Sequence, residues 1–134
     1  MAILNFGARL DECKKASEIL KKKGISISIF DARFAKPLDE RSIIELASNH
    51  EAIITIEEGS IGGFGSHITK LLSDRGFFDK GLKFRSIVLP DKFLDQDTPE
   101  KMYKIAGLDC ESIVQKVENV LNSNVVIAKN KNLS

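Results

Sequence analysis

The stretch "TIEEGSIGGFGSHITKLL", residues 55–72, places four glycines within seven residues, between an apolar run and a helical pattern. Parallel α/β proteins bind nucleotides at such a turn, because backbone N–H groups and the positive end of a helix converge there. These glycines, however, are spaced G-x-x-G-G-x-G rather than G-x-G-x-x-G, and the stretch lacks the lysine of a phosphate-binding loop. The spacing therefore favours a tight structural turn with close helix packing.

Two carboxylates, Glu57 and Glu58, come directly before the glycines. Each would cost about 1 kcal/mol beside a bound phosphate in solvent. Successive strand residues point to opposite faces, so capping of the following helix is a simpler role than shared acid–base catalysis. We predict that at least one of Gly62, Gly63 and Gly65 has a positive φ or a helix packed on its Cα. The predicted structural loop and possible interface consist of Glu57, Glu58, Gly59, Ile61, Gly62, Gly63, Phe64 and Gly65.

Strand and helix patterns alternate on both sides of this loop. Apolar runs and β-branched residues predict strands at 2–7, 25–30, 52–56 and 84–90. Helical spacing and capping residues predict helices at 10–23, 39–50, 67–76, 98–107 and 109–121. Single helices between strands indicate a largely parallel sheet with helices on both faces. We expect one domain over 1–121, followed by a loosely ordered tail at 122–134.

Composition narrows the classes of protein. The chain has 134 residues, 43% of them hydrophobic, and a formal charge of +1, so no net field attracts nucleic acid or anionic membrane. No apolar run reaches the roughly 18 residues that span a bilayer. Cys13 and Cys110 form no CxxC pair, which indicates a reducing cytoplasm. Together with His50 and His67 they make a complete ligand set for a metal, but without local ligand pairs such a site is disfavoured.

Three stretches together resemble a known family: "DARFAKPLD" at 31–39, "TIEEGSIGGFGSHI" at 55–68 and "LPDKFLDQDTPEKMYKIAGLD" at 89–109. They are similar to the C-terminal domain of 1-deoxy-D-xylulose-5-phosphate synthase, a thiamine-diphosphate-dependent enzyme of the transketolase group. The resemblance covers residues 2–121. It implies a three-layer α/β/α domain with a mixed, mostly parallel five-stranded sheet, one edge strand being antiparallel. The fifth strand has only weak candidates, "VVIA" at 125–128 and the residues near 80.

The resemblance also implies what this chain lacks. The parent enzyme joins pyruvate and glyceraldehyde 3-phosphate by using thiamine diphosphate and magnesium, in a step toward isoprenoids, thiamine and pyridoxal cofactors. The family's magnesium motif and catalytic histidines have no counterpart here, so no catalytic, cofactor-binding or metal residue is carried over. We therefore expect a non-catalytic domain in the cytoplasm, whose partners are the enzyme's remaining domains and, in the full-length protein, a second copy.

Two other functions stay open at this point. One is a free-standing ligand-binding module that uses the glycine-rich loop, and the other is one subunit of a split transketolase-like enzyme. A chain that opens directly on a strand at Ala2 favours an excised domain over a free module. The loop's apolar residues Ile61 and Phe64 are expected to pack between domains or subunits as well as within this domain, and Phe64→Ala should barely change the stability of this chain alone.

Overall fold

A computed structural model describes residues 1–6, 10–31, 40–58, 63–89, 101 and 109–132. The elements follow the predicted order of strands and helices. They are β1 (Ala2–Phe6), α1 (Leu10–Lys22), β2 (Ser28–Asp31), α2 (Glu40–Asn49), β3 (Ala52–Glu58), α3 (Phe64–Asp74), β4 (Lys83–Leu89) and α5 (Cys110–Asn132). The helix predicted at 98–107 falls outside the described residues, apart from Lys101.

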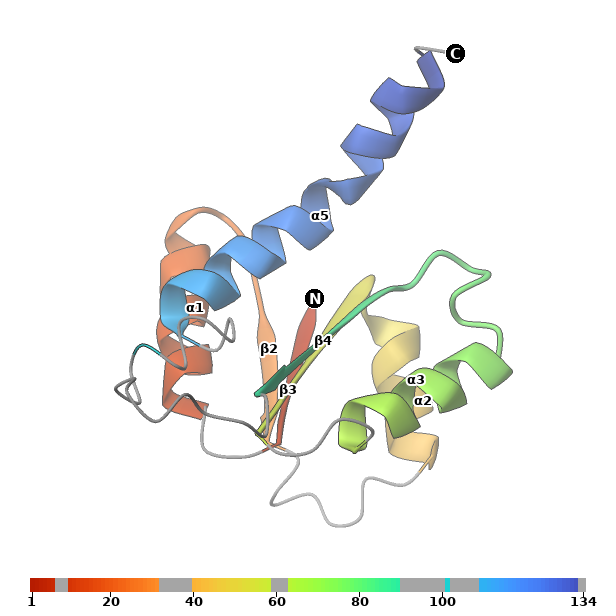
Figure 1. Cartoon of the computed structure of the whole chain (residues 1–134), viewed down its shortest axis with the longest axis horizontal. Helices are drawn as coiled ribbons and strands as arrows, with labels where there is room; N and C mark the ends of the chain where they lie inside the picture. The colour runs from red at the N-terminus through yellow and green to blue at the C-terminus, as the bar shows by residue number, and fades with distance from the viewer. Residues whose placement is uncertain (7–9, 32–39, 59–62, 90–100, 102–108, 133–134) are drawn as a thin grey trace.

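The four described strands form one parallel sheet in the order β2-β1-β3-β4. Helices α1 and α5 cover one face, and α2 and α3 cover the other (Figure 1). This arrangement confirms the predicted α/β/α layers. The described strands number four rather than five, and none of them is antiparallel. Both candidates for a fifth strand were wrong, because 125–128 belong to α5 and 77–82 form a turn closed by a hydrogen bond from Leu82 N to Phe77 O.

Alternation along the two central strands builds a core on each side of the sheet. In β1, Ile3 packs toward α1 and α5, whereas Leu4 packs toward α2 and α3. In β3, Ile54 packs toward α1 and α5, and Ile53 packs toward α2 and α3. All four side chains are fully buried. The prediction that the 52–56 run is buried on both faces is therefore confirmed.

Glycines end α1 and α3, as the sequence predicted. Gly24 has φ +82 and Gly76 has φ +76, the left-handed conformation that follows a helix end. The residue after each glycine bonds back to the last turn, Ile25 N to Leu20 O at 2.9 Å and Phe77 N to Leu72 O at 3.0 Å. These turns lead the chain to the amino-terminal ends of β2 and β4.

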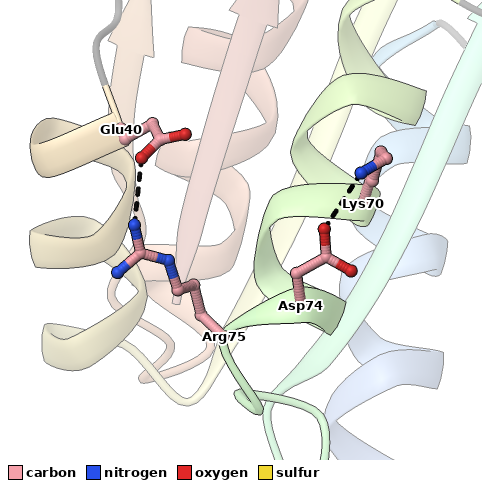
Figure 2. Close-up of polar contacts among 4 residues, drawn as sticks. All are labelled: Glu40, Lys70, Asp74 and Arg75. Carbon is pink, nitrogen blue, oxygen red and sulfur yellow. Dashed lines mark hydrogen bonds and ion pairs between the residues drawn. The ribbon is translucent and has the colours of Figure 1, made fainter.

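One exposed ion pair links α2 to the residue that follows α3, and another lies within α3. Arg75 Nη2 donates to Glu40 Oε2 at 3.0 Å, and within α3 Lys70 Nζ lies 3.0 Å from Asp74 Oδ2 (Figure 2). All four side chains are more than half exposed, so each pair adds at most about 1 kcal/mol. The stability of this layer comes instead from the buried apolar residues beneath it.

Several elements differ in their bounds from the predictions. The strand predicted at 25–30 begins only at Ser28, since Ile25 closes the turn after α1. The last helix, predicted to end at Leu121, continues to Asn132, and Figure 1 shows it projecting beyond the sheet. Within the described ranges, no helix combines the length and apolar content that crossing a bilayer requires.

Candidate functional site

The strand order reverses at the carboxyl ends of β1 and β3. From β1 the chain moves to β2 on one side of the sheet, and from β2 it crosses back to β3 on the other side. In open α/β sheets, ligands bind where the strand order reverses in this way. Phe6 and Glu57 are paired across the two strands at this point. The glycine-rich loop follows directly, although its residues 59–62 lie outside the described residues.

Glu57 closes the amino-terminal end of α3. Its side chain is only 4% exposed, and its Oε2 accepts a hydrogen bond of 2.6 Å from the backbone N–H of Gly65. The N-cap residue, Gly63, makes no side-chain capping bond, so the strand supplies the carboxylate that the helix end requires. Capping, the simpler role predicted for this carboxylate, is confirmed for Glu57. Its carboxylate takes a donor that a phosphate would use in a nucleotide-binding loop.

Gly65 lets the first turn of α3 lie directly on the sheet. A Cβ at this position would lie 2.5 Å from Ser86 Oγ and 3.0 Å from Thr55 Oγ1. A distance of 2.5 Å is too short for a carbon–oxygen contact, so a side chain at this position would require Ser86 Oγ to rotate away and would press tightly on Thr55 Oγ1. Of the three glycines named in the prediction, Gly65 lacks room for a Cβ, but it lies in α3 itself, and strand side chains rather than a packed helix approach it; Gly63 has an ordinary φ of −82.

An aromatic pair lies next to the capped helix end. The rings of Phe6 and Phe64 stack with centroids 5.0 Å apart and an interplanar angle of 16°. Phe64 is half-buried against the α2/α3 core, whereas Phe6 is 39% exposed. Sequence reasoning singled out Phe64 and missed Phe6, whose one signal was its place as the last apolar residue of the first strand. Ile61, the other apolar residue predicted at this surface, lies outside the described residues.

A second helix start at the same edge is also closed by the chain's own carboxylates. Ser112 N–H donates to Asp109 Oδ1 at 3.1 Å, which confirms the predicted cap, and Cys110 N–H donates to Glu12 Oε2 at 2.9 Å. The Glu12 contact joins residues far apart in sequence, and sequence reasoning missed it. The starts of α3 and α5 thus both have backbone donors occupied by carboxylates.

The four residues of the disfavoured metal set do not come together. Cys13, on the buried face of α1, and Cys110 belong to the α1/α5 core, whereas His50 follows α2 and bonds to Leu46 O, and His67 is exposed on α3. Burial raises the pKa of the Cys110 thiol, and the nearby Glu12 carboxylate raises it further, so the thiol stays protonated at neutral pH. In the part of the chain that the structure describes, no three potential ligands gather around a metal position.

Comparison with known proteins adds two structures. One, described as a split gene transketolase, inactive beta4 tetramer, matches with a TM-score of 0.75 and 27% sequence identity, covering 90% of this chain and 39% of that chain. The other, a GDP-L-fucose synthetase from Naegleria fowleri bound to NADP, has a TM-score of 0.39 and 16% identity, covering 96% of this chain and 46% of that one. The second likeness is too low to support an inference.

The family comparison agrees with the first structure. Residues 1–113 match the family model described as "Transketolase, C-terminal domain", which takes in every described strand and the start of α5. This chain spans only 39% of the split transketolase chain that it matches. On the match over residues 1–113, the chain belongs to the transketolase C-terminal domain family.

Proposed function

We propose that this chain is the C-terminal domain of a cytoplasmic 1-deoxy-D-xylulose-5-phosphate synthase, and that its function is assembly rather than chemistry. In this role it packs against the domains that hold thiamine diphosphate and magnesium, and it supports the homodimer of the complete enzyme. The observation that carries the proposal is the family match over residues 1–113. The assignment to this synthase in particular rests on the stretches at 31–39, 55–68 and 89–109.

The geometry of the switch point supports an assembly role. Glu57 already occupies the Gly65 N–H at the start of α3, so an incoming phosphate would have to displace a buried carboxylate. Beside it, the Phe6–Phe64 stack leaves an aromatic surface exposed. Aromatic side chains at such exposed patches are typical of protein contacts. This edge therefore suits a neighbouring protein surface better than a nucleotide, which argues against the free ligand-binding module.

A second candidate function is a subunit of a split transketolase-like enzyme, whose other domains are encoded separately. The structural match at 27% identity favours it, because that protein is described as a split gene transketolase. It is also described as an inactive tetramer of one chain type, which suggests that such a chain associates with itself and needs a partner for activity. Both candidates assign the same non-catalytic role to this domain and differ in the reaction of the complete enzyme.

The experiment uses the complete enzyme that contains this chain. We expect it to form deoxyxylulose phosphate from pyruvate and glyceraldehyde 3-phosphate, with release of carbon dioxide. Ketol transfer between sugar phosphates without pyruvate would establish the second candidate instead. If the complete enzyme, loaded with thiamine diphosphate, catalyses neither reaction, both candidate functions are contradicted.

The assembly role is tested by Phe64→Ala in the same enzyme. We expect dimerisation to weaken by about 1–3 kcal/mol, because a ring that anchors a contact leaves a void when removed. Sedimentation velocity over a concentration series measures this change. Ile19→Ala is the matched control, since Ile19 is also 39% exposed, like Phe6, but lies on the outer side of α1. If the Phe64→Ala and Ile19→Ala enzymes have equal dimer stability, Phe64 does not contribute to the dimer interface.

A further inference from the structure

A hollow of about 400 Å³ lies at the opposite edge of the sheet, where β3 and β4 begin. The end of α2 and the turn between α3 and β4 enclose it, and both lie at this edge in Figure 1. Its volume is within the range of small-molecule sites. All of its lining residues belong to the described part of the chain. This hollow is separate from the Glu57–Phe64 site.

The hollow is preformed by backbone hydrogen bonds. Leu82 N–H donates to Phe77 O at 3.2 Å, and Lys83 N–H donates to Glu51 O at 3.1 Å, which fastens the turn to the start of β3. Gly81 has φ +91, a conformation that favours glycine and directs the chain into β4. A site held in this way loses little conformational entropy when a ligand binds.

The end of α2 and Glu51 give their part of the hollow a negative electrostatic potential. The end of α2 carries the partial negative charge of a helix carboxyl terminus, and the exposed Glu51 carboxylate lies two residues beyond it. His50 Nδ1 lies 2.9 Å from Leu46 O and must be the donor, because a carbonyl oxygen only accepts. In the neutral ring, Nε2 is then a further acceptor. These groups favour a ligand that donates hydrogen bonds and carries positive charge.

The lining of the hollow also includes apolar side chains and a lysine. The apolar residues are Ala47 from the end of α2, and Phe77 and Leu82 from the turn before β4. The Lys80 ammonium lies over the Phe77 ring, with Nζ 5.7 Å from the ring centroid, which is within cation–π range. A lysine that lines the hollow thus already places its positive charge over an aromatic ring of the same lining.

We propose that this hollow binds an alkylammonium or alkylguanidinium group. The alkyl part lies on Ala47, Phe77 and Leu82, and the charged head lies between the end of α2, Glu51 and the face of Phe77, in place of the Lys80 ammonium. The group is either a free small cation or a lysine or arginine side chain of a partner protein. Two kinds of probe distinguish these sources.

The first experiment titrates the full 134-residue chain with n-butylguanidinium and follows its backbone amides by NMR. We expect saturable shifts at Ser48, Glu51 and Gly81, while Gly65 at the far edge of the sheet stays unchanged. Butyrate, which has a similar chain but the opposite charge, should give no saturable shift. No saturation with n-butylguanidinium, or equal shifts with butyrate, would overturn the proposal.

Two charge variants test the proposed site, because they are expected to change the affinity for n-butylguanidinium in opposite directions. Glu51→Gln should weaken n-butylguanidinium binding about fivefold, the loss of one favourable charge near the surface. Lys80→Gln should strengthen it by a similar factor, because the competing ammonium is removed from the Phe77 ring. Glu18→Gln and Lys14→Gln are matched controls from the exposed surface of α1 and should leave the affinity unchanged. Changes of the same sign at Glu51 and Lys80, or no change at either, would contradict the site.

The source of the cation is decided by the tripeptide acetyl-Gly-Arg-Gly-amide. If a partner side chain is the natural occupant, the tripeptide binds at least as tightly as n-butylguanidinium, because the hollow then admits a flanking backbone. If a free cation is the natural occupant, the tripeptide binds more weakly. Either result supports the cation site, and loss of binding by both probes rejects it.

Discussion

Gly65 and Glu57 fix how α3 begins. Glu57 supplies the acceptor for the helix end, and Gly65 supplies both the donor and the space in which Thr55 and Ser86 of the sheet contact the helix. The sequence predicted that a loop glycine would be required and that a carboxylate would cap, but it did not say which glycine. That choice depends on the distance between α3 and two strands, and no local pattern encodes this distance.

Gly65→Ala should lower the free energy of unfolding by about 1 kcal/mol, the low end of the usual overpacking cost, because the exposed Ser86 hydroxyl can rotate away whereas Thr55 is buried. Its Cβ would meet Ser86 Oγ at 2.5 Å. Urea unfolding followed by circular dichroism measures the change. Ser66→Ala, the neighbouring exposed position on α3, is the control and should stay within about 0.5 kcal/mol of the parent. Equal stability of the two variants would refute the close approach.

Glu57→Gln tests the cap without changing its shape. Glutamine keeps an oxygen acceptor for Gly65 N–H but removes the negative charge, so we expect a loss of about 1 kcal/mol in unfolding free energy. Glu45→Gln on the exposed surface of α2 should change it by less than about 0.5 kcal/mol. A Glu57→Gln protein as stable as the parent would mean that the charge contributes nothing to the helix start.

Phe64→Ala in this chain alone should cost about 1–2 kcal/mol, since its ring is half-buried rather than fully buried. This value exceeds the near-zero change expected from the sequence, because the Phe6–Phe64 stack joins two segments that the sequence pattern does not connect. Urea unfolding of the isolated chain measures it. A cost of about 3–5 kcal/mol would show that the ring belongs to the domain's own core.

At the scale of elements, hydrophobic periodicity predicted most of the fold. The stripe of Ile113, Val117 and Val120 marked α5 correctly, and all three side chains are buried. The alternation of isoleucine and serine in "ISISIF" predicted a strand that starts three residues too early. Extended residues that follow a helix cap show the same two-residue alternation as residues paired in a sheet. The length of α5 was also underestimated, since the polar residues after Leu121 gave no apolar stripe to follow.

Truncation after Asn122 tests which part of α5 the domain requires. The last fully buried side chain described in this helix is Val120, so the shortened chain should unfold within about 0.5 kcal/mol of the parent. Val117→Ala in the same helix is the contrast. It should cost about 1–3 kcal/mol, because it opens a cavity between α1 and α5. If truncation costs as much as Val117→Ala, the domain extends beyond residue 121.

For the whole molecule, ligand response separates an assembly domain from a binding module. NAD, ATP, sugar phosphates and thiamine diphosphate with magnesium should each leave the melting temperature unchanged at millimolar concentration. A ligand that binds the folded state at 100 times its dissociation constant would add about 2.7 kcal/mol, which raises the melting temperature by several degrees. Differential scanning fluorimetry measures this shift. A dose-dependent rise with any of these compounds would favour the binding module.

β1 is synthesised before both of its sheet neighbours. Its partner strands are complete only after Asp31 and Glu58, and the α1/α5 core is closed only by Ile113, Val117 and Val120. At ordinary rates of synthesis, roughly 3–12 s separate the synthesis of Glu58 from that of Val120. During that interval one apolar face of the sheet lacks its second helix. We therefore expect a chain that stalls in this interval to expose the apolar face that α5 covers in the folded domain, and to bind chaperones or aggregate until α5 is made.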